Sequence, residues 1–132
     1  MLNTFLVMAG GAIGSALRYQ LSRLVPPLVL TAPHGGVAAT SFPMATLAAN
    51  LIGGLAMGLL AGALLRVGSA EAWRLFLGVG ILGGFTTFSA FSFEIVDLLQ
   101  DGRWLIAASY IICSVAGSVI ALAMGIALTR AL

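Results

Sequence analysis

An apolar run without a formal charge, Leu75–Phe93, constrains this chain more than any other feature of its sequence. The run is about long enough to cross a bilayer as a helix. Its centre, residues 83–92 (GGFTTFSAFS), nevertheless contains two adjacent glycines, two adjacent threonines and two serines. Glycine permits the backbone to turn, and a β-branched threonine pair weakens the helix that follows. We therefore predict a membrane-spanning helix that is broken near its centre.

A break of this kind has chemical consequences. In lipid an unpaired backbone group is costly, so irregular chain persists only where it is buried in protein or lines a cavity. The freed carbonyls then need donors or a cation, and the freed amides need an anion or a hydroxyl. The break is therefore a candidate ion site.

The composition supports a membrane protein over the whole length. Of the 132 residues, 61% are hydrophobic and 8% are charged, whereas a soluble domain has roughly 25% charged residues. The expectation is one all-α integral membrane domain over 1–132, with four transmembrane helices at about 2–24, 43–65, 75–97 and 104–129. A separate soluble domain and a removable signal peptide are not expected. Six arginines and no lysine are too few to indicate nucleic-acid binding.

Glycines recur at a spacing of four residues, which lets membrane helices approach closely. They are Gly10 and Gly14, then Gly54, Gly58 and Gly62, then Gly80 and Gly84. The connection over 25–42 is long, rich in proline and rather apolar, and we expect it to lie on the membrane surface. Its single histidine, His34, is more typical of a solvated side chain than of a metal ligand.

The six arginines are divided three against three between the two sides of a four-span protein. One side carries Arg66, Arg74 and Arg130, and the other carries Arg18, Arg23 and Arg103. Because an excess of Lys and Arg on the cytoplasmic side sets orientation, this division predicts insertion in both directions. Two oppositely oriented copies would form an antiparallel homodimer with a two-fold axis in the membrane plane.

Neutral polar and aromatic side chains are the candidates for lining a path. They are Asn50, Thr86, Thr87, Phe88, Ser89, Phe91, Tyr110, Ser114 and Ser118. The last three fall at i, i+4 and i+8 and so share one helix face. Neutral donors favour an anion over a cation, and the edges of aromatic rings are electropositive. At the two-fold axis, carbonyls from two breaks could hold a monovalent cation such as Na⁺.

Structural alternatives stay open for these residues. Asn50 could form an interhelical hydrogen bond, the phenylalanines could face lipid or the core, and a serine could bond to its own helix. Arg18 could reach the lipid headgroups or pair with a carboxylate. Glu94 could lie at the membrane edge or reach a buried partner or vestibule. Catalysis is not expected, because no His or Lys that could activate a nucleophile lies in any predicted span.

Four blocks of the sequence resemble the small dual-topology fluoride channels of the Fluc or CrcB-like family. The blocks are residues 10–14 with Arg18 and Tyr19, residues 46–53, residues 83–92 with Glu94, and the face of Tyr110, Ser114 and Ser118. The resemblance implies an antiparallel homodimer with two fluoride pores, passive export of F⁻, and a multi-pass location in the bacterial inner membrane.

The resemblance also implies roles for individual residues. The backbone carbonyls of Gly83 and Thr86 would hold a structural Na⁺ at the dimer interface. The fluoride pore would be formed by Asn50, Phe88, Phe91, Tyr110, Ser114 and Ser118. Supporting roles would fall to Arg18, Thr87, Ser89 and Glu94.

Two other functions remain open. A proton-coupled small-molecule exporter of dual topology would need a carboxylate in the membrane, and Glu94 is the only candidate. A non-transporting membrane assembly subunit would use its polar residues only to hold helices together.

Overall fold

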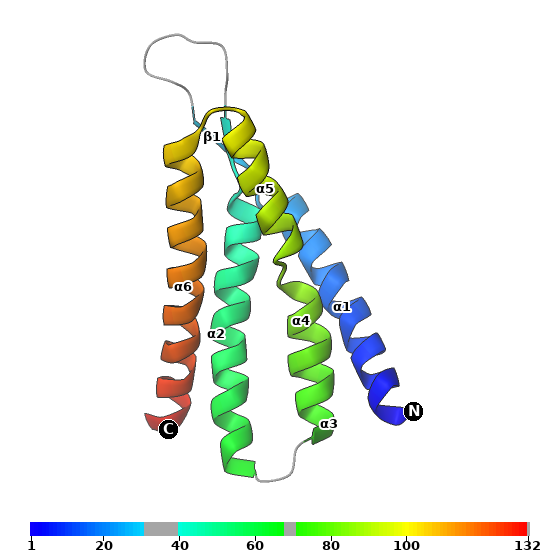
Figure 1. The fold of residues 1–132 in the computed structure, drawn as a ribbon. Helices are drawn as coiled ribbons and strands as arrows, with labels where there is room; N and C mark the ends of the chain where they lie inside the picture. The colour runs from blue at the N-terminus through cyan, green and yellow to red at the C-terminus, as the bar shows by residue number, and fades with distance from the viewer. Residues whose placement is uncertain (31–39, 68–70, 132) are drawn as a thin grey trace.

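The computed structural model describes residues 1–30, 40–67 and 71–131, and these residues form a bundle of long helices (Figure 1). Helix α1 spans Leu2–Leu24, α2 spans Met44–Val67 and α6 spans Trp104–Ala131. These bounds agree closely with the predicted helices at 2–24, 43–65 and 104–129. The start of α2 follows Pro43, which accepts a hydrogen bond from the Leu47 amide (3.2 Å) and suits the first turn of a helix because it has no amide to pair.

The third helical stretch consists of four pieces. It begins with α3 (Glu71–Trp73) and the π-helix η1 (Arg74–Leu82), continues through α4 (Gly83–Phe85), and resumes as α5 (Ser89–Gln100). Between α4 and α5 the chain leaves helical geometry at Thr86, whose φ of −79° and ψ of 158° are extended. The predicted break is confirmed. The π-helix was not predicted.

The position of the break differs from the prediction. Gly83 has helical angles (φ −64°, ψ −37°) and Gly84 lies within α4, so the glycine pair does not turn the chain. Its second member serves close packing, since a Cβ on Gly84 would lie 2.7 Å from the carbonyl oxygen of Gly11. The turn begins instead at the β-branched Thr86, where side-chain hydrogen bonds replace those of the helix.

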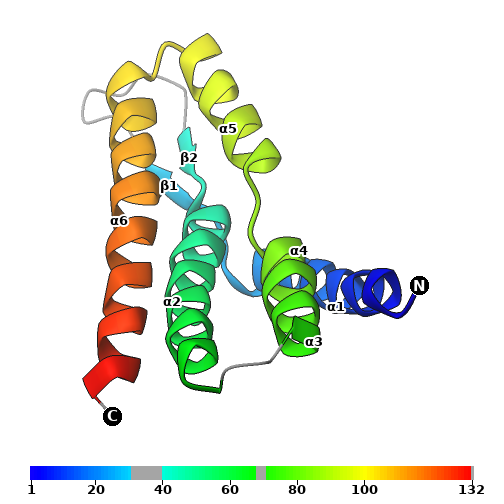
Figure 2. The same cartoon turned by 60° about the horizontal axis from the view of Figure 1, so that its bottom comes forward.

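Glycines hold α1 against the first half of the third stretch. A Cβ on Gly80 would lie 2.9 Å from the Gly10 Cα, and one on Gly14 would overlap the carbonyl oxygen of Ile81. The two backbones are therefore in direct contact, as the predicted four-residue spacing of glycines requires. Figure 2 shows α1 passing beside α4 on the side away from α6.

A second set of glycines holds α2 against α6. A Cβ on Gly54 would lie 2.7 Å from the Ser118 carbonyl oxygen, and one on Gly58 would overlap the Leu122 carbonyl oxygen. Gly125 on α6 approaches α2 in the same way, with the Leu59 amide nitrogen 2.7 Å from its Cβ position. The bundle thus consists of two tightly packed pairs, α1 with η1–α4 and α2 with α6.

The connection between α1 and α2 contains a short antiparallel ladder that the all-α prediction missed. Strands β1 (Leu28–Leu30) and β2 (Thr40–Phe42) pair with Leu28 opposite Phe42 and Leu30 opposite Thr40. Apolar and β-branched residues favour strands, and the prolines at 26, 27 and 43 separate these strands from the flanking helices. His34 lies outside the described residues.

The turn between α5 and α6 is closed by Gly102, whose φ of 72° is left-handed. The Gly102 amide donates to the Leu99 carbonyl (3.0 Å) and the Arg103 amide donates to the Leu98 carbonyl (2.8 Å). Two carbonyls at the end of α5 are thereby satisfied by backbone donors, as in common glycine-terminated helix ends.

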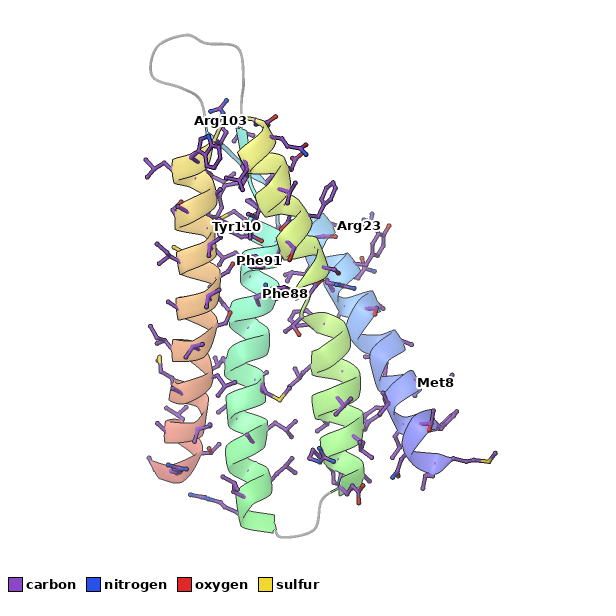
Figure 3. All side chains as sticks on the ribbon, viewed as in Figure 1. Met8, Arg23, Phe88, Phe91, Arg103 and Tyr110 are labelled. Atoms are coloured by element: carbon purple, nitrogen blue, oxygen red, sulfur yellow. The ribbon has the colours of Figure 1, made fainter. Side chains whose placement is uncertain are left out.

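Length and mean hydropathy identify three stretches of the described residues as candidate membrane spans. They are Met44–Arg66, Glu71–Gln100 and Trp104–Ala131, with mean hydropathies of 1.8, 1.6 and 2.4. Helix α1 is not one of them. Several of its large apolar side chains are nevertheless exposed, and Met8 is 67% exposed (Figure 3). The three stretches indicate a multi-pass membrane protein of mostly helical structure.

Candidate functional site

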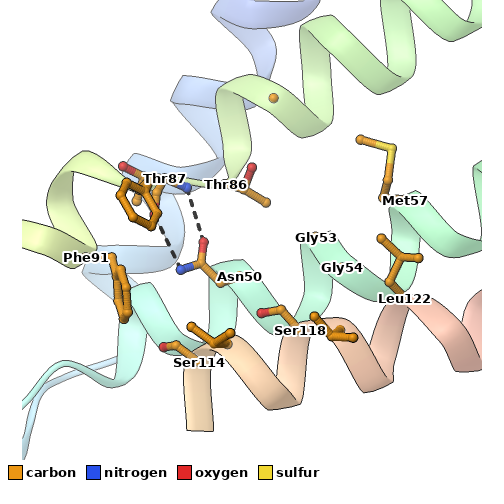
Figure 4. Close-up of a pocket in the computed structure, with 14 residues that line it drawn as sticks. Asn50, Gly53, Gly54, Met57, Thr86, Thr87, Phe91, Ser114, Ser118 and Leu122 are labelled. Atoms are coloured by element: carbon orange, nitrogen blue, oxygen red, sulfur yellow. Dashed lines mark hydrogen bonds between the residues drawn. The ribbon is translucent and has the colours of Figure 1, made fainter. Parts of the chain in front are cut away.

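A cavity of about 550 Å³ lies at the break, between the third helical stretch and the α2–α6 pair (Figure 4). Eight of the residues predicted for the ion site line it: Asn50, Gly83, Thr86, Thr87, Phe88, Phe91, Ser114 and Ser118. The rest of the wall is formed by Gly53, Gly54, Met57, Val115, Val119 and Leu122. Four predicted residues, Arg18, Ser89, Glu94 and Tyr110, do not line this cavity.

Asn50 connects α2 to the break through both ends of its amide. Its Oδ1 accepts a hydrogen bond from the Thr87 amide (3.1 Å), and its Nδ2 donates to the Thr87 carbonyl (3.4 Å). The Asn50 side chain thus pairs with both backbone groups of Thr87. Asn50 therefore does bond a second segment, but its partner lies in the break and not in a neighbouring helix. Because an amide carries two N–H groups, the second remains for the cavity.

This contact leaves backbone carbonyls of the break without their helical donors. In an α-helix the Gly83 carbonyl would accept from the Thr87 amide, which here donates to Asn50. The Thr86 carbonyl would accept from the Ala90 amide, which donates to the Thr87 hydroxyl (3.2 Å). In the described part of the chain these two carbonyls are therefore available to another donor or to a cation. Backbone carbonyls at membrane depth need such a partner.

The threonine pair closes the two helix ends beside the break. The Thr86 hydroxyl donates to the Leu82 carbonyl (2.9 Å), which also accepts from the Thr86 amide (3.0 Å). The Thr87 hydroxyl accepts from the Ala90 amide at the start of α5, and it lies 3.3 Å from the Ser89 hydroxyl. Both threonines therefore stabilise the interruption through their side chains, which is a role the sequence did not assign.

Two serine hydroxyls of α6 are buried at the cavity. The Oγ atoms of Ser114 and Ser118 have no hydrogen-bond partner among the described residues. The alternative that they bond to their own helix is therefore wrong. Each hydroxyl can donate to a group inside the cavity, and a buried hydroxyl without a partner costs about 1–3 kcal/mol.

The phenylalanine pair spans the edge of the cavity. The rings of Phe88 and Phe91 have centroids 5.7 Å apart and planes inclined by 50°. Phe91 is buried (6% exposed), whereas Phe88 is 78% exposed in the single chain. Phe91 also contacts the ring of Tyr110 at 5.1 Å. One ring thus belongs to the core, and the other projects from it.

Tyr110 and Glu94 form a separate polar cluster above the cavity. The fully buried Tyr110 donates its hydroxyl to Oε2 of Glu94 (2.6 Å), and Thr46 donates to Oε1 (2.7 Å). Glu94 is therefore held between α2 and α6, which agrees with the alternative in which it reaches a partner inside the protein. It lines a second cavity of about 220 Å³ together with Thr46 and Asp97. Thr46 was missed as a site residue, although it precedes Asn50 by one helical turn on the same face.

The cationic side chains do not reach either cavity wall. Arg18 is half-buried and forms no ion pair within the described residues, so the alternative of pairing with a carboxylate is not seen there. The Arg23 guanidinium lies over the ring of Tyr19, 5.9 Å from its centroid. This contact fits the alternative in which the end of α1 lies in an aromatic and basic belt at the headgroups.

Comparison with known proteins gives a consistent set of relatives. A family model described as CrcB-like protein, Camphor Resistance (CrcB), matches residues 5–126. A fluoride-specific ion channel FluC from Erythrobacter litoralis is 47% identical over 129 residues, which cover 96% of this chain and 91% of the relative. Proteins of the same name from Novosphingobium aromaticivorans and Methylobacterium nodulans are 47% and 44% identical, each over 98% of both chains.

Proposed function

The chain belongs to the CrcB-like family, and from this membership we propose that it is a fluoride-specific ion channel. The observation that carries the proposal is the identity of 47% with a relative of that name over 96% of this chain. The activity is transport across a membrane and not catalysis, since the relatives are named as ion channels.

The chemistry of the larger cavity supports an anion as the transported species. Its polar wall offers hydroxyl and amide donors, from Ser114, Ser118 and the second N–H of Asn50, and none of the described residues that line it carries a carboxylate. Fluoride is a small anion that accepts hydrogen bonds, and neutral donors bind it without the retention that a full positive charge would cause. Conduction requires binding that is weak enough for the ion to leave.

The conducting unit in this proposal is an antiparallel homodimer in which each copy has four spans. The division of arginines supports both orientations, and Phe88, exposed at the cavity edge, offers an apolar surface for a second copy. Residues Asn50, Phe88, Phe91, Ser114 and Ser118 would line each of two pores. Tyr110 would act from the adjoining cluster with Glu94.

A structural Na⁺ at the break is the second part of the proposal. The carbonyls of Gly83 and Thr86 have lost their helical donors to Asn50 and Thr87, and oxygen ligands suit a hard monovalent cation. Gly83 is exposed in the single chain, so carbonyls of a second copy could complete the coordination. The ion would satisfy these groups at membrane depth.

The direction of transport would be export from a bacterial cell through its inner membrane. A negative-inside potential favours anion exit by roughly 2.3 kcal/mol per 100 mV. No other energy source is needed, so the flux should be passive.

Purified protein in liposomes tests the proposal with a fluoride electrode. We expect F⁻ efflux that needs only a permeable counter-ion, with no efflux when chloride replaces fluoride. Efflux that required a proton gradient would instead favour the exporter.

The carboxylate at the second cavity, Glu94, gives the exporter a specific candidate and therefore a specific test. Fluoride efflux that persists in Glu94→Gln without a proton gradient would exclude that rival. A correctly assembled protein with no ion flux under any condition would leave the assembly subunit as the function.

A further inference from the structure

Gly53 lies on α2 one turn after Asn50 and faces the break. A Cβ at this position would overlap the Cγ2 methyl of Thr86, while the other near atoms, Phe85 Cδ1 and Thr86 Cβ, would lie at 3.6 and 3.7 Å. The Thr86 methyl therefore occupies the space that a side chain at position 53 would need. Both residues line the larger cavity.

The Thr86 side chain is not free to move its methyl elsewhere. Its hydroxyl donates to the Leu82 carbonyl (2.9 Å) and so closes the end of α4. In threonine the hydroxyl and the methyl share one carbon, and β-branched side chains are stiff about χ1. Fixing the hydroxyl therefore fixes the methyl. The rotamer that closes the helix end is the one that needs a glycine opposite.

This contact acts at the residue where the chain leaves the helix. Thr86 has extended angles, its carbonyl has lost its helical donor, and the next residue is held by Asn50. Asn50 and Gly53 are at i and i+3 and so share one face of α2. Gly53 thus contacts Thr86, and Asn50, on the same face of α2, bonds the next residue, Thr87.

We infer that Gly53 is a positioning residue of the ion path: it seats the Thr86 methyl, and this seat fixes the direction of the Thr86 carbonyl and the width of the cavity beside it. The inference rests on the proposed channel function. A methyl at position 53 would force Thr86 either to rotate and release the Leu82 carbonyl or to move away from α2. Both movements displace the wall of the path.

The neighbouring glycine allows this role to be separated from ordinary helix packing. A Cβ on Gly54 would meet the backbone of α6, 2.7 Å from the Ser118 carbonyl oxygen, and no atom of Thr86 is among its near contacts. Deleting the Thr86 methyl should therefore relieve Gly53→Ala and should not relieve Gly54→Ala. Thr86→Ser makes this deletion and keeps the hydroxyl that bonds Leu82.

The experiment compares initial F⁻ efflux from liposomes and apparent Tm in detergent for six proteins. They are the wild type, Gly53→Ala, Thr86→Ser, Gly53→Ala with Thr86→Ser, Gly54→Ala, and Gly54→Ala with Thr86→Ser. We expect Gly53→Ala to slow efflux at least tenfold in the wild-type background and less than twofold in the Thr86→Ser background. Gly54→Ala should have the same effect in both backgrounds.

Each remaining outcome decides the inference. Wild-type efflux from Gly53→Ala, or equal slowing in both backgrounds, would overturn it. If Gly53→Ala does not yield folded protein, recovery of a monodisperse protein by adding Thr86→Ser supports the inferred contact between position 53 and the Thr86 methyl. No recovery overturns the inference. If the wild type passes no fluoride, the channel function fails. The contact between Gly53 and the Thr86 methyl is then tested by Tm alone, which Gly53→Ala should lower only when Thr86 is present.

Discussion

The double contact of the Asn50 amide with Thr87 is the point at which one side chain determines the path of the backbone. Asn50→Leu keeps the volume and removes both hydrogen bonds, which leaves the Thr87 amide and carbonyl unpaired. We expect the free energy of unfolding to fall by about 2 kcal/mol, measured by reversible unfolding in detergent. Asn3→Leu, at an exposed position of α1, is the control, and equal losses in both variants would contradict the assigned contact.

The hydroxyl of Tyr110 permits a second test at the same scale. Tyr110→Phe keeps the contact with the ring of Phe91 but removes the donor to Glu94. Because a buried acceptor that loses its donor is costly, we expect a loss of about 1–3 kcal/mol of unfolding free energy. Tyr19→Phe should change it by less than about 0.5 kcal/mol, since Tyr19 is 62% exposed. A double-mutant cycle with Glu94→Gln would show no coupling if the contact does not exist.

At the scale of elements, the end of α5 depends on one backbone conformation. Gly102 has a φ of 72°, which a side chain disfavours by about 1–2 kcal/mol. We expect Gly102→Ala to lower the apparent Tm of the protein in detergent. Gly102→Asn should lower it less, because asparagine tolerates the left-handed region. Equal melting of both variants and the wild type would show that the turn relaxes without glycine.

The sequence predicted the long helices and the break because apolar runs and glycine spacing are local signals. It placed the turn at Gly83 and Gly84, since glycine is the usual residue of a turn. The actual turn at Thr86 depends on Asn50, which is distant in the sequence. The π-helix and the β1–β2 ladder likewise depend on packing between elements, so they cannot be predicted from one local stretch of sequence.

The site was predictable to a similar degree. Residue type and helical spacing were enough to predict eight residues that line one cavity, because α2 and α6 each present one face to the break. The bonding partners were not predictable. Tyr110 and Ser114 share a helix face, yet one hydroxyl binds Glu94 and the other has no partner among the described residues. That difference arises because Glu94 of α5 lies opposite Tyr110.

At the scale of the whole molecule, orientation should respond to single arginines. We expect C-terminal reporter fusions of the wild type on both sides of the membrane. Arg23→Gln should bias the termini toward the cytoplasm, because the side with the termini then carries the excess of arginines. Arg66→Gln should give the opposite bias. Reporters found on one side only, for all three proteins, would exclude dual topology.

The interleaved pairing of the helices has a consequence for how the chain is made. Helix α2 packs on α6, while η1 and α4 pack on α1, so neither α1 nor α2 has its main partner in the next long helix along the chain. At a ribosomal speed of about 5–20 residues per second, α2 would wait on the order of several seconds for α6. During that interval its glycine-lined flank would face lipid or other nascent chains, and a delay in translation beyond residue 104 would prolong the exposure.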